Sequence, residues 1–83
     1  MARFKWDDWN LAKIAAHGLS SDEVEHAYEH AVGAHARRED DSYETFGATP
    51  SGRVILIVWR TNDEFDALEE GSVIQVVFVI TAY

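Results

Sequence analysis

The chain has 83 residues, no cysteine and a formal net charge of −8, because fifteen Asp and Glu outnumber seven Lys and Arg. This length fits a single domain spanning residues 1–83. Apolar residues make up 47% of the chain and aromatic residues 12%, which excludes a disordered chain and allows one packed core. The lack of cysteine excludes disulfide stabilisation and thiol chemistry.

Charge and hydropathy also limit where the protein acts and what it binds. A net negative protein repels phosphate backbones unless its few cations are gathered in one place, so we expect no direct DNA binding. The longest apolar run, at residues 54–59, is far too short to span a bilayer, and the first six residues contain no apolar signal-peptide core. We therefore expect a cytoplasmic protein that makes no contact with a membrane.

The first half of the chain has the pattern of one strand followed by two helices. Alternating charged and aromatic residues predict a short strand at residues 3–6. A helix is expected over residues 8–17, with Gly18 at its C-terminal end. Ser20 and Glu23 have the spacing of a capping box and predict the start of a second helix. The short connection between the two helices predicts a helical hairpin.

The second half has the composition and spacing of strands. An acidic connection is expected at residues 61–71, and Gly47 is expected to form a β-bulge. The expected strands lie at residues 34–38, 43–49, 53–60 and 72–82. Together these elements predict an α+β fold of order β-α-α-β-β-β-β, with a mainly antiparallel sheet and the helices packed on one face.

The last two strands predict an interaction surface. The strand at residues 53–60 is apolar on both faces, whereas two short helices can cover only one face of the sheet. Exposed apolar patches of this kind are usually interfaces, so we expect a homodimer or another bound protein. The alternative is that the acidic loop folds over this face. We expect the exposed face of the last strand to be formed by Gln75, Val77, Val79 and Thr81.

Short motifs along the whole chain resemble those of the BrnT-like toxins of bacterial toxin–antitoxin pairs, or uncharacterised relatives of these toxins. The most specific motifs are Trp6-Asp7 followed by His17-Gly18, and the hairpin Gly47-x-Thr49-x-x-Gly52-Arg53. The resemblance implies a compact fold like that of the RelE-type ribonucleases. It also implies metal-independent cleavage of RNA and a tightly bound cognate antitoxin.

Cleavage of RNA without a metal ion needs a base, an acid, and cations that stabilise the additional phosphate charge. Lys13 and His17 are four residues apart and share a helix face. Arg53 begins the central strand and carries a planar guanidinium suited to phosphate. Asp41 lies where members of the family tend to carry a carboxylate. The predicted catalytic residues are Lys13, His17, Asp41 and Arg53, with Arg37 and Arg38 as further RNA-binding cations.

Each of these residues also has a purely structural interpretation. His17 can cap the first helix, Lys13 can lie on a solvated helix face, and Arg53 can flank an aggregation-prone strand. Tyr83 stands where active-looking members of the family carry an arginine. The alternative function is therefore a non-catalytic binding module of the same fold, which acts through its exposed sheet face.

No cofactor or metal site is predicted. His26 and His30 have the i, i+4 spacing of zinc ligands. However, Ala27 occupies the position of the glutamate that a zinc protease carries beside the first histidine. A bare histidine pair of this kind is weak evidence for a metal.

Overall fold

A computed structural model describes residues 3–61, 68–69, 72–73 and 76–83 of the chain. The elements are β1 (Arg3–Lys5), α1 (Asp8–Ala15), α2 (Ser21–Glu29), β2 (Ala36–Arg37), β3 (Tyr43–Ala48), β4 (Val54–Thr61), β5 (Leu68–Glu69), β6 (Ser72–Val73) and β7 (Val76–Ala82). In the main sheet the strand order is β1-β7-β4-β3-β2, and β5 pairs with β6 separately. Strand β1 runs parallel to β7, and the other pairings are antiparallel.

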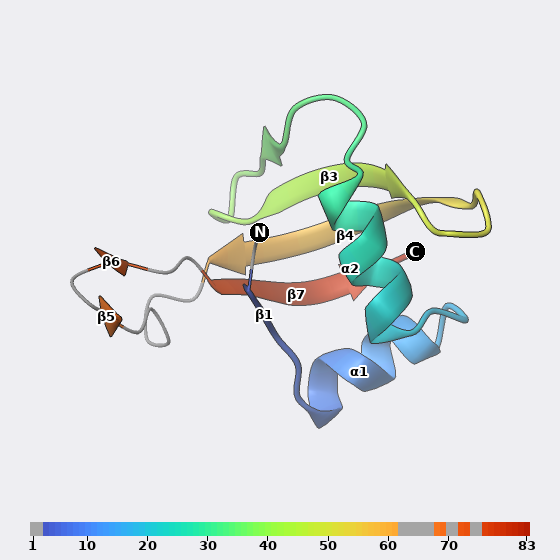
Figure 1. Ribbon diagram of the computed structural model, residues 1–83, viewed down its shortest axis with the longest axis horizontal. Coiled ribbons are helices and arrows are strands. Elements are labelled where there is room, and N and C mark those ends of the chain that lie inside the picture. The colour runs from blue at the N-terminus through green and yellow to red at the C-terminus, as the bar shows by residue number, and fades with distance from the viewer. Residues whose placement is uncertain (1–2, 62–67, 70–71, 74–75) are drawn as a thin grey trace.

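The predicted α+β fold is confirmed, with both helices on one side of the sheet. Helix α2 crosses one face of the sheet, and α1 lies along the side of β7 (Figure 1). Within the part of the chain that the structure describes, no helix is long and apolar enough to cross a membrane.

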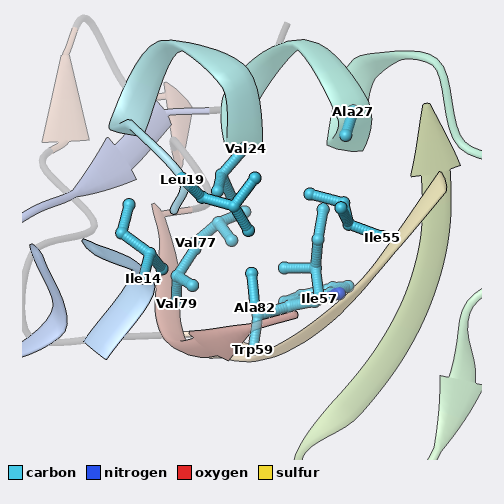
Figure 2. Close-up of a cluster of buried hydrophobic side chains, with 10 residues drawn as sticks. All are labelled: Ile14, Leu19, Val24, Ala27, Ile55, Ile57, Trp59, Val77, Val79 and Ala82. Atoms are coloured by element: carbon cyan, nitrogen blue, oxygen red, sulfur yellow. The ribbon is translucent and has the colours of Figure 1, made fainter. Parts of the chain in front are cut away.

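The core lies between α2, the end of α1 and the inner face of β4 and β7 (Figure 2). Aliphatic side chains dominate it, and Trp59 is its largest member. Because these side chains are fully removed from water, their burial provides the main driving force for folding. The buried cluster consists of Ile14, Leu19, Val24, Ala27, Ile55, Ile57, Trp59, Val77, Val79 and Ala82.

From Val76 to Val79 the faces of β7 are the reverse of those expected from the sequence. Val77 and Val79 are 1% and 0% exposed and pack beneath the helices, so the prediction that they form an open interface is wrong. Thr81 is half-buried and pairs with Val58 beyond the irregularity in the β4–β7 pairing, so it does lie on the face away from the helices. Gln75 lies outside the described residues. Both alternating sets of residues in this strand are apolar, so hydropathy cannot tell which set faces the helices. A one-residue shift in register moves every side chain to the other face.

The role expected for Gly47 is also different in the structure. Gly47 pairs regularly with Ile55 and forms no bulge. Its function is close packing, because a Cβ atom at this position would overlap the backbone carbonyl of Ala27 in α2. The β-bulge lies instead in the β4–β7 pairing, where the register shifts between Val58 and Trp59.

Both helices begin with a capping box. In α2 the predicted pair is confirmed, since Ser20 and Glu23 exchange side-chain-to-backbone hydrogen bonds at 3.3 and 3.0 Å. In α1 the pair is Asp7 and Asn10, at 3.0 and 2.8 Å. The amide of Asn10 also donates to the carbonyl of Lys5 at 2.9 Å. This bond ties the end of β1 to the first turn of α1.

Candidate functional site

The C-terminal end of α1 forms the first part of the candidate site. The amides of Gly18 and Leu19 donate to the carbonyls of Ala15 and Ile14 at 2.9 and 3.1 Å. Gly18 has a φ of +74°, the left-handed conformation that glycine adopts without strain. This Schellman arrangement ends the helix two residues earlier than predicted. It leaves the side chain of His17 exposed at the surface.

Arg53 connects the start of β4 to this helix end. Its Nη1 atom donates to the carbonyl oxygen of His17 at 3.1 Å, and its backbone amide donates to the Thr49 hydroxyl at 3.2 Å. A cation beside the carbonyls at the end of a helix is favourable because it opposes the negative end of the helix dipole. The guanidinium has five N–H donors, so one bond to His17 uses a small part of its capacity.

Tyr83 brings the end of the last strand into the same site. Its backbone exchanges hydrogen bonds with Leu56 at 2.8 and 3.0 Å, which continues the β4–β7 pairing beyond Ala82. Its ring lies against the ring of His17, with 5.4 Å between the centroids. Sequence reasoning missed this contact, because the residue was noted only as a replacement for an arginine. No local sequence pattern predicts which residue of β4 pairs with the residue that follows β7.

Lys13 lies in the last turn of α1, four residues before His17. Its Nζ atom is 5.4 Å from the ring centroid of Trp9, and Trp9 stacks on Phe78 of β7 with 6.1 Å between centroids. The step of four residues places Trp9 and Lys13 on one face of the helix, whereas His17 follows the last helical residue, Ala15. Trp9 contacts Phe78 and His17 contacts Tyr83, so this segment lies beside the C-terminal strand.

Asp41 does not join these residues. It lies two residues before Tyr43, at one end of β3. Arg53 lies beside the other end, because Ala48 pairs with Val54. The length of β3 separates the two ends by roughly 17 Å. The prediction that the four catalytic candidates share one cleft is therefore wrong for Asp41.

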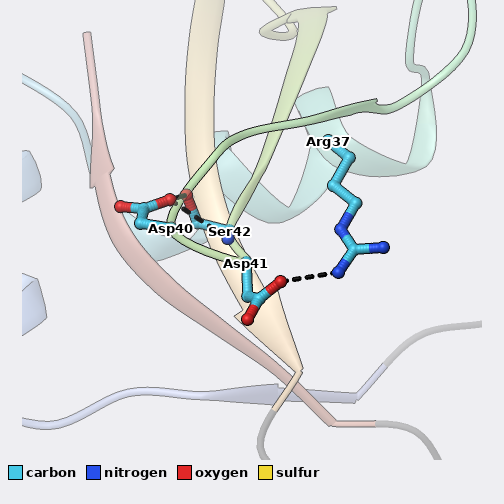
Figure 3. Close-up of polar contacts among 4 residues, drawn as sticks. All are labelled: Arg37, Asp40, Asp41 and Ser42. Atoms are coloured by element: carbon cyan, nitrogen blue, oxygen red, sulfur yellow. Dashed lines mark hydrogen bonds and ion pairs between the residues drawn. The ribbon is translucent and has the colours of Figure 1, made fainter.

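Asp41 belongs to a polar turn between β2 and β3 (Figure 3). It has a φ of +64°, and its carboxylate accepts a hydrogen bond from Nη2 of Arg37 at 2.6 Å. The neighbouring carboxylate of Asp40 accepts from the hydroxyl and the amide of Ser42. These two hydrogen bonds favour the ionised form and lower the pKa of Asp40.

The surroundings of Arg37 and Arg38 are acidic. Nε of Arg38 lies 3.7 Å from Oε1 of Glu44. An open depression of about 480 Å³ at this turn is lined by Arg37, Arg38, Glu39, Asp40 and Glu44. Carboxylates outnumber guanidiniums there, and such a surface repels phosphate. We therefore leave these two arginines out of the candidate site.

His26 and His30 are not arranged as a chelating pair. Their Nδ1 atoms lie 3.1 and 2.9 Å from the backbone carbonyls of Ala48 and His26. Their rings are stacked, with 4.1 Å between centroids and 17° between planes. Ring-nitrogen lone pairs lie in the ring planes, so those of stacked rings run side by side and do not meet at one ion. Among the described residues no group of three or more His, Cys, Asp or Glu is placed to hold a metal ion.

After the end of α1, His17 thus contacts Arg53 and the unpredicted Tyr83, and Lys13 lies in the last turn of the same helix. We call this set the His17 cluster; it consists of Lys13, His17, Arg53 and Tyr83. No family model matches the chain, and no curated protein or solved structure gives a significant match. The resemblance to BrnT-like toxins therefore stays a prediction based on the motifs.

Proposed function

We propose that this chain is a BrnT-like endoribonuclease that cleaves RNA with the His17 cluster and without a metal ion. The observation that carries the proposal is the meeting of an imidazole, a phenol and a guanidinium at one helix end. The rings of His17 and Tyr83 are 5.4 Å apart between centroids, and Arg53 is 3.1 Å from the His17 carbonyl. Two proton carriers and a cation are the groups that such a reaction needs.

In the proposed reaction, His17 takes the proton from a 2′-hydroxyl of the RNA, and the freed oxygen attacks the adjacent phosphorus. The bond from phosphorus to the 5′-oxygen breaks, and Tyr83 gives its phenolic proton to that leaving oxygen. The products are a 2′,3′-cyclic phosphate and a 5′-hydroxyl end. Arg53 and Lys13 stabilise the negative charge that develops on the phosphoryl oxygens. The proton then passes from His17 back to Tyr83 through solvent.

An assay of the purified chain on single-stranded RNA tests this proposal. We expect cyclic-phosphate ends from the wild type, and a loss of about 10²–10³-fold in rate for Arg53→Ala, because one charge-stabilising group is removed. His17→Ala should lower the rate by about 10²–10⁴-fold. His30→Ala is the matched control and should cleave normally, since the His30 ring bonds to its own helix.

Circular dichroism of each variant must match the wild type before the rates are compared. Wild-type protein that leaves RNA intact overturns the proposal. Equal loss of cleavage in His30→Ala and His17→Ala also overturns it, because the effect would then not depend on the cluster. The resemblance to BrnT-like toxins implies a cognate antitoxin that inhibits the enzyme in the cytoplasm. We include this partner in the proposal.

A second candidate function is a non-catalytic binding module of the same fold. The observation that favours it is the exposure of Phe46 and Val54 on the sheet face opposite α2. A chain that leaves RNA intact but binds a protein through this face would have the second function and not the first.

A further inference from the structure

Exposed apolar side chains are concentrated on the sheet face opposite α2. The large apolar side chains exposed in the described residues are Leu11 at 37%, Tyr83 at 49%, Trp9 at 51%, Phe46 at 52%, Val54 at 63% and Val32 at 66%. All of them except Leu11 lie on this face or at its margin: the strand register and hydrogen bonding place Val32, Phe46, Val54 and Tyr83, and Trp9 stacks on Phe78 of β7. Apolar surface gathered in this way on one face usually marks an interaction site.

The hydrogen bonding places four of these side chains and Leu56 next to one another. The amide of Val32 donates to the carbonyl of Phe46 at 2.7 Å, Phe46 pairs with Leu56, and Leu56 exchanges hydrogen bonds with Tyr83. Residues opposite each other in antiparallel strands project to the same face. Val32, Phe46, Leu56 and Tyr83 thus form a row across the sheet, and Val54 lies beside Leu56 on the same face. We call these five side chains the open patch.

The size of the open patch suits the centre of a protein interface. A half-exposed aromatic side chain presents roughly 100 Å², so the five side chains together present roughly 400 Å² of mostly apolar surface. A stable complex of standard size buries about 800 Å² on each partner. In such interfaces the centre is apolar and aromatic and the rim is polar. The open patch supplies a centre of that kind and about half of the required area.

The placement of the charges among the described residues favours a second copy of the same chain as the occupant. Four acidic residues lie on α2, on the opposite side of the sheet. The one carboxylate on the same face of β3 as Phe46 is Glu44, and it is paired with Arg38. Two chains that meet through this face keep their acidic helices outward and far apart. The aliphatic members of the patch offer no donor to a phosphate or a base, so its centre suits protein better than RNA.

We propose that a second copy of this chain docks on the open patch, with the two sheets face to face. Sheets that pack in this way lie about 10 Å apart and interdigitate their inner side chains. An isologous contact needs only a self-complementary patch, which a row of alternating aliphatic and aromatic side chains provides.

Self-association through this face also covers the His17 cluster. Tyr83 belongs to both sets, because its backbone pairs with Leu56 and its ring lies against His17. This second step rests on the proposed function. The paired chain is then inactive, and RNA cleavage per chain rises as the protein is diluted and the pairs dissociate.

Sedimentation velocity over a wide dilution series tests the contact without reference to RNA. We expect the wild type to form a reversible dimer and Val54→Glu to weaken it about 100-fold or more, because two carboxylates would be buried without partners. Phe46→Glu is a second variant with the same expectation. Leu11→Glu is the matched control and should dimerise like the wild type, since it adds the same charge away from the patch.

Wild-type protein that stays monomeric at all concentrations overturns the proposal, as does a dimer that Val54→Glu leaves intact. A monomer that binds an uncleavable 2′-O-methyl oligonucleotide through Phe46 identifies RNA as the occupant, and also overturns it. A dimer that cleaves no RNA at any dilution supports the contact and contradicts the proposed function. Cleavage per chain that is constant across the dilution series overturns the link between the patch and the His17 cluster.

Discussion

Tyr28 lies in an aromatic cluster on the inner side of the molecule. Its ring meets Phe4 and Trp59 edge to face, each with 5.2 Å between centroids. Partial burial disfavours the phenolate and raises the pKa of Tyr28 above 10.0, and the charge of Glu29 adds to the effect. The folded chain therefore holds this proton at a pH at which the unfolded chain releases it.

This difference predicts how stability changes in alkali. Because the pKa of Tyr28 is raised on folding, its contribution is complete below pH 10.0 and is lost as pH rises through the raised value. Tyr28→Phe keeps the ring and cannot ionise, so the variant should lose less free energy of unfolding above pH 10.0 than the wild type. Urea unfolding at neutral and alkaline pH measures this. Parallel pH dependences for the two proteins would contradict the assignment.

At the residue scale, the sequence predicted which residues belong to the His17 cluster better than it predicted the contacts that these residues make. The four-residue spacing of Lys13 and His17 is local information, but the shared helix face that it predicts was not found, because α1 ends at Ala15. The contact of Arg53 with His17 joins residues 36 positions apart and was expected only through the resemblance. Tyr83 and Asp41 depend on strand register and strand length, which no short motif encodes.

At the scale of elements, α2 can pack closely on β3 because Gly47 has no side chain. Gly47→Ala should lower the free energy of unfolding by about 3 kcal/mol, because the added Cβ would overlap the backbone of α2 at Ala27 and a helix backbone cannot easily yield. Gly33→Ala is the matched control: nothing lies within 4 Å of its added Cβ, so only the strain of its φ of +80° remains, about 1 kcal/mol. Urea unfolding measures both variants. Equal costs would show that α2 moves aside without penalty.

The elements that the sequence predicts well are those specified by neighbouring residues. The capping box of Ser20 and Glu23 and the glycine stop at Gly18 were both found as expected. The orientation of β7 was not predicted correctly, because both of its faces are apolar and only the position of the helices distinguishes them. The parallel pairing of β1 with β7 joins the two ends of the described chain. The sequence of β1 does not indicate which strand it pairs with.

At the scale of the whole molecule, the acidic residues of α2 lie on the opposite side of the sheet from the open patch, as far as the described residues show. Helix α2 and the β2–β3 turn carry carboxylates, whereas the open patch is aliphatic and aromatic. Because the net charge is −8, two copies of the chain repel one another electrostatically. Association then requires the apolar contact to exceed this repulsion, so the balance depends on ionic strength.

The two occupants considered for the open patch respond to salt with opposite sign. Raising the ionic strength from about 0.01 M to about 1 M shortens the Debye length from about 30 Å to about 3 Å. Repulsion between two chains of charge −8 is then screened, and the dissociation constant of a dimer held by apolar contact should fall roughly tenfold. Binding of RNA releases counterions and weakens as salt rises. Sedimentation velocity at the two ionic strengths measures the sign, and a dimer that dissociates in high salt would show that ion pairs hold it together.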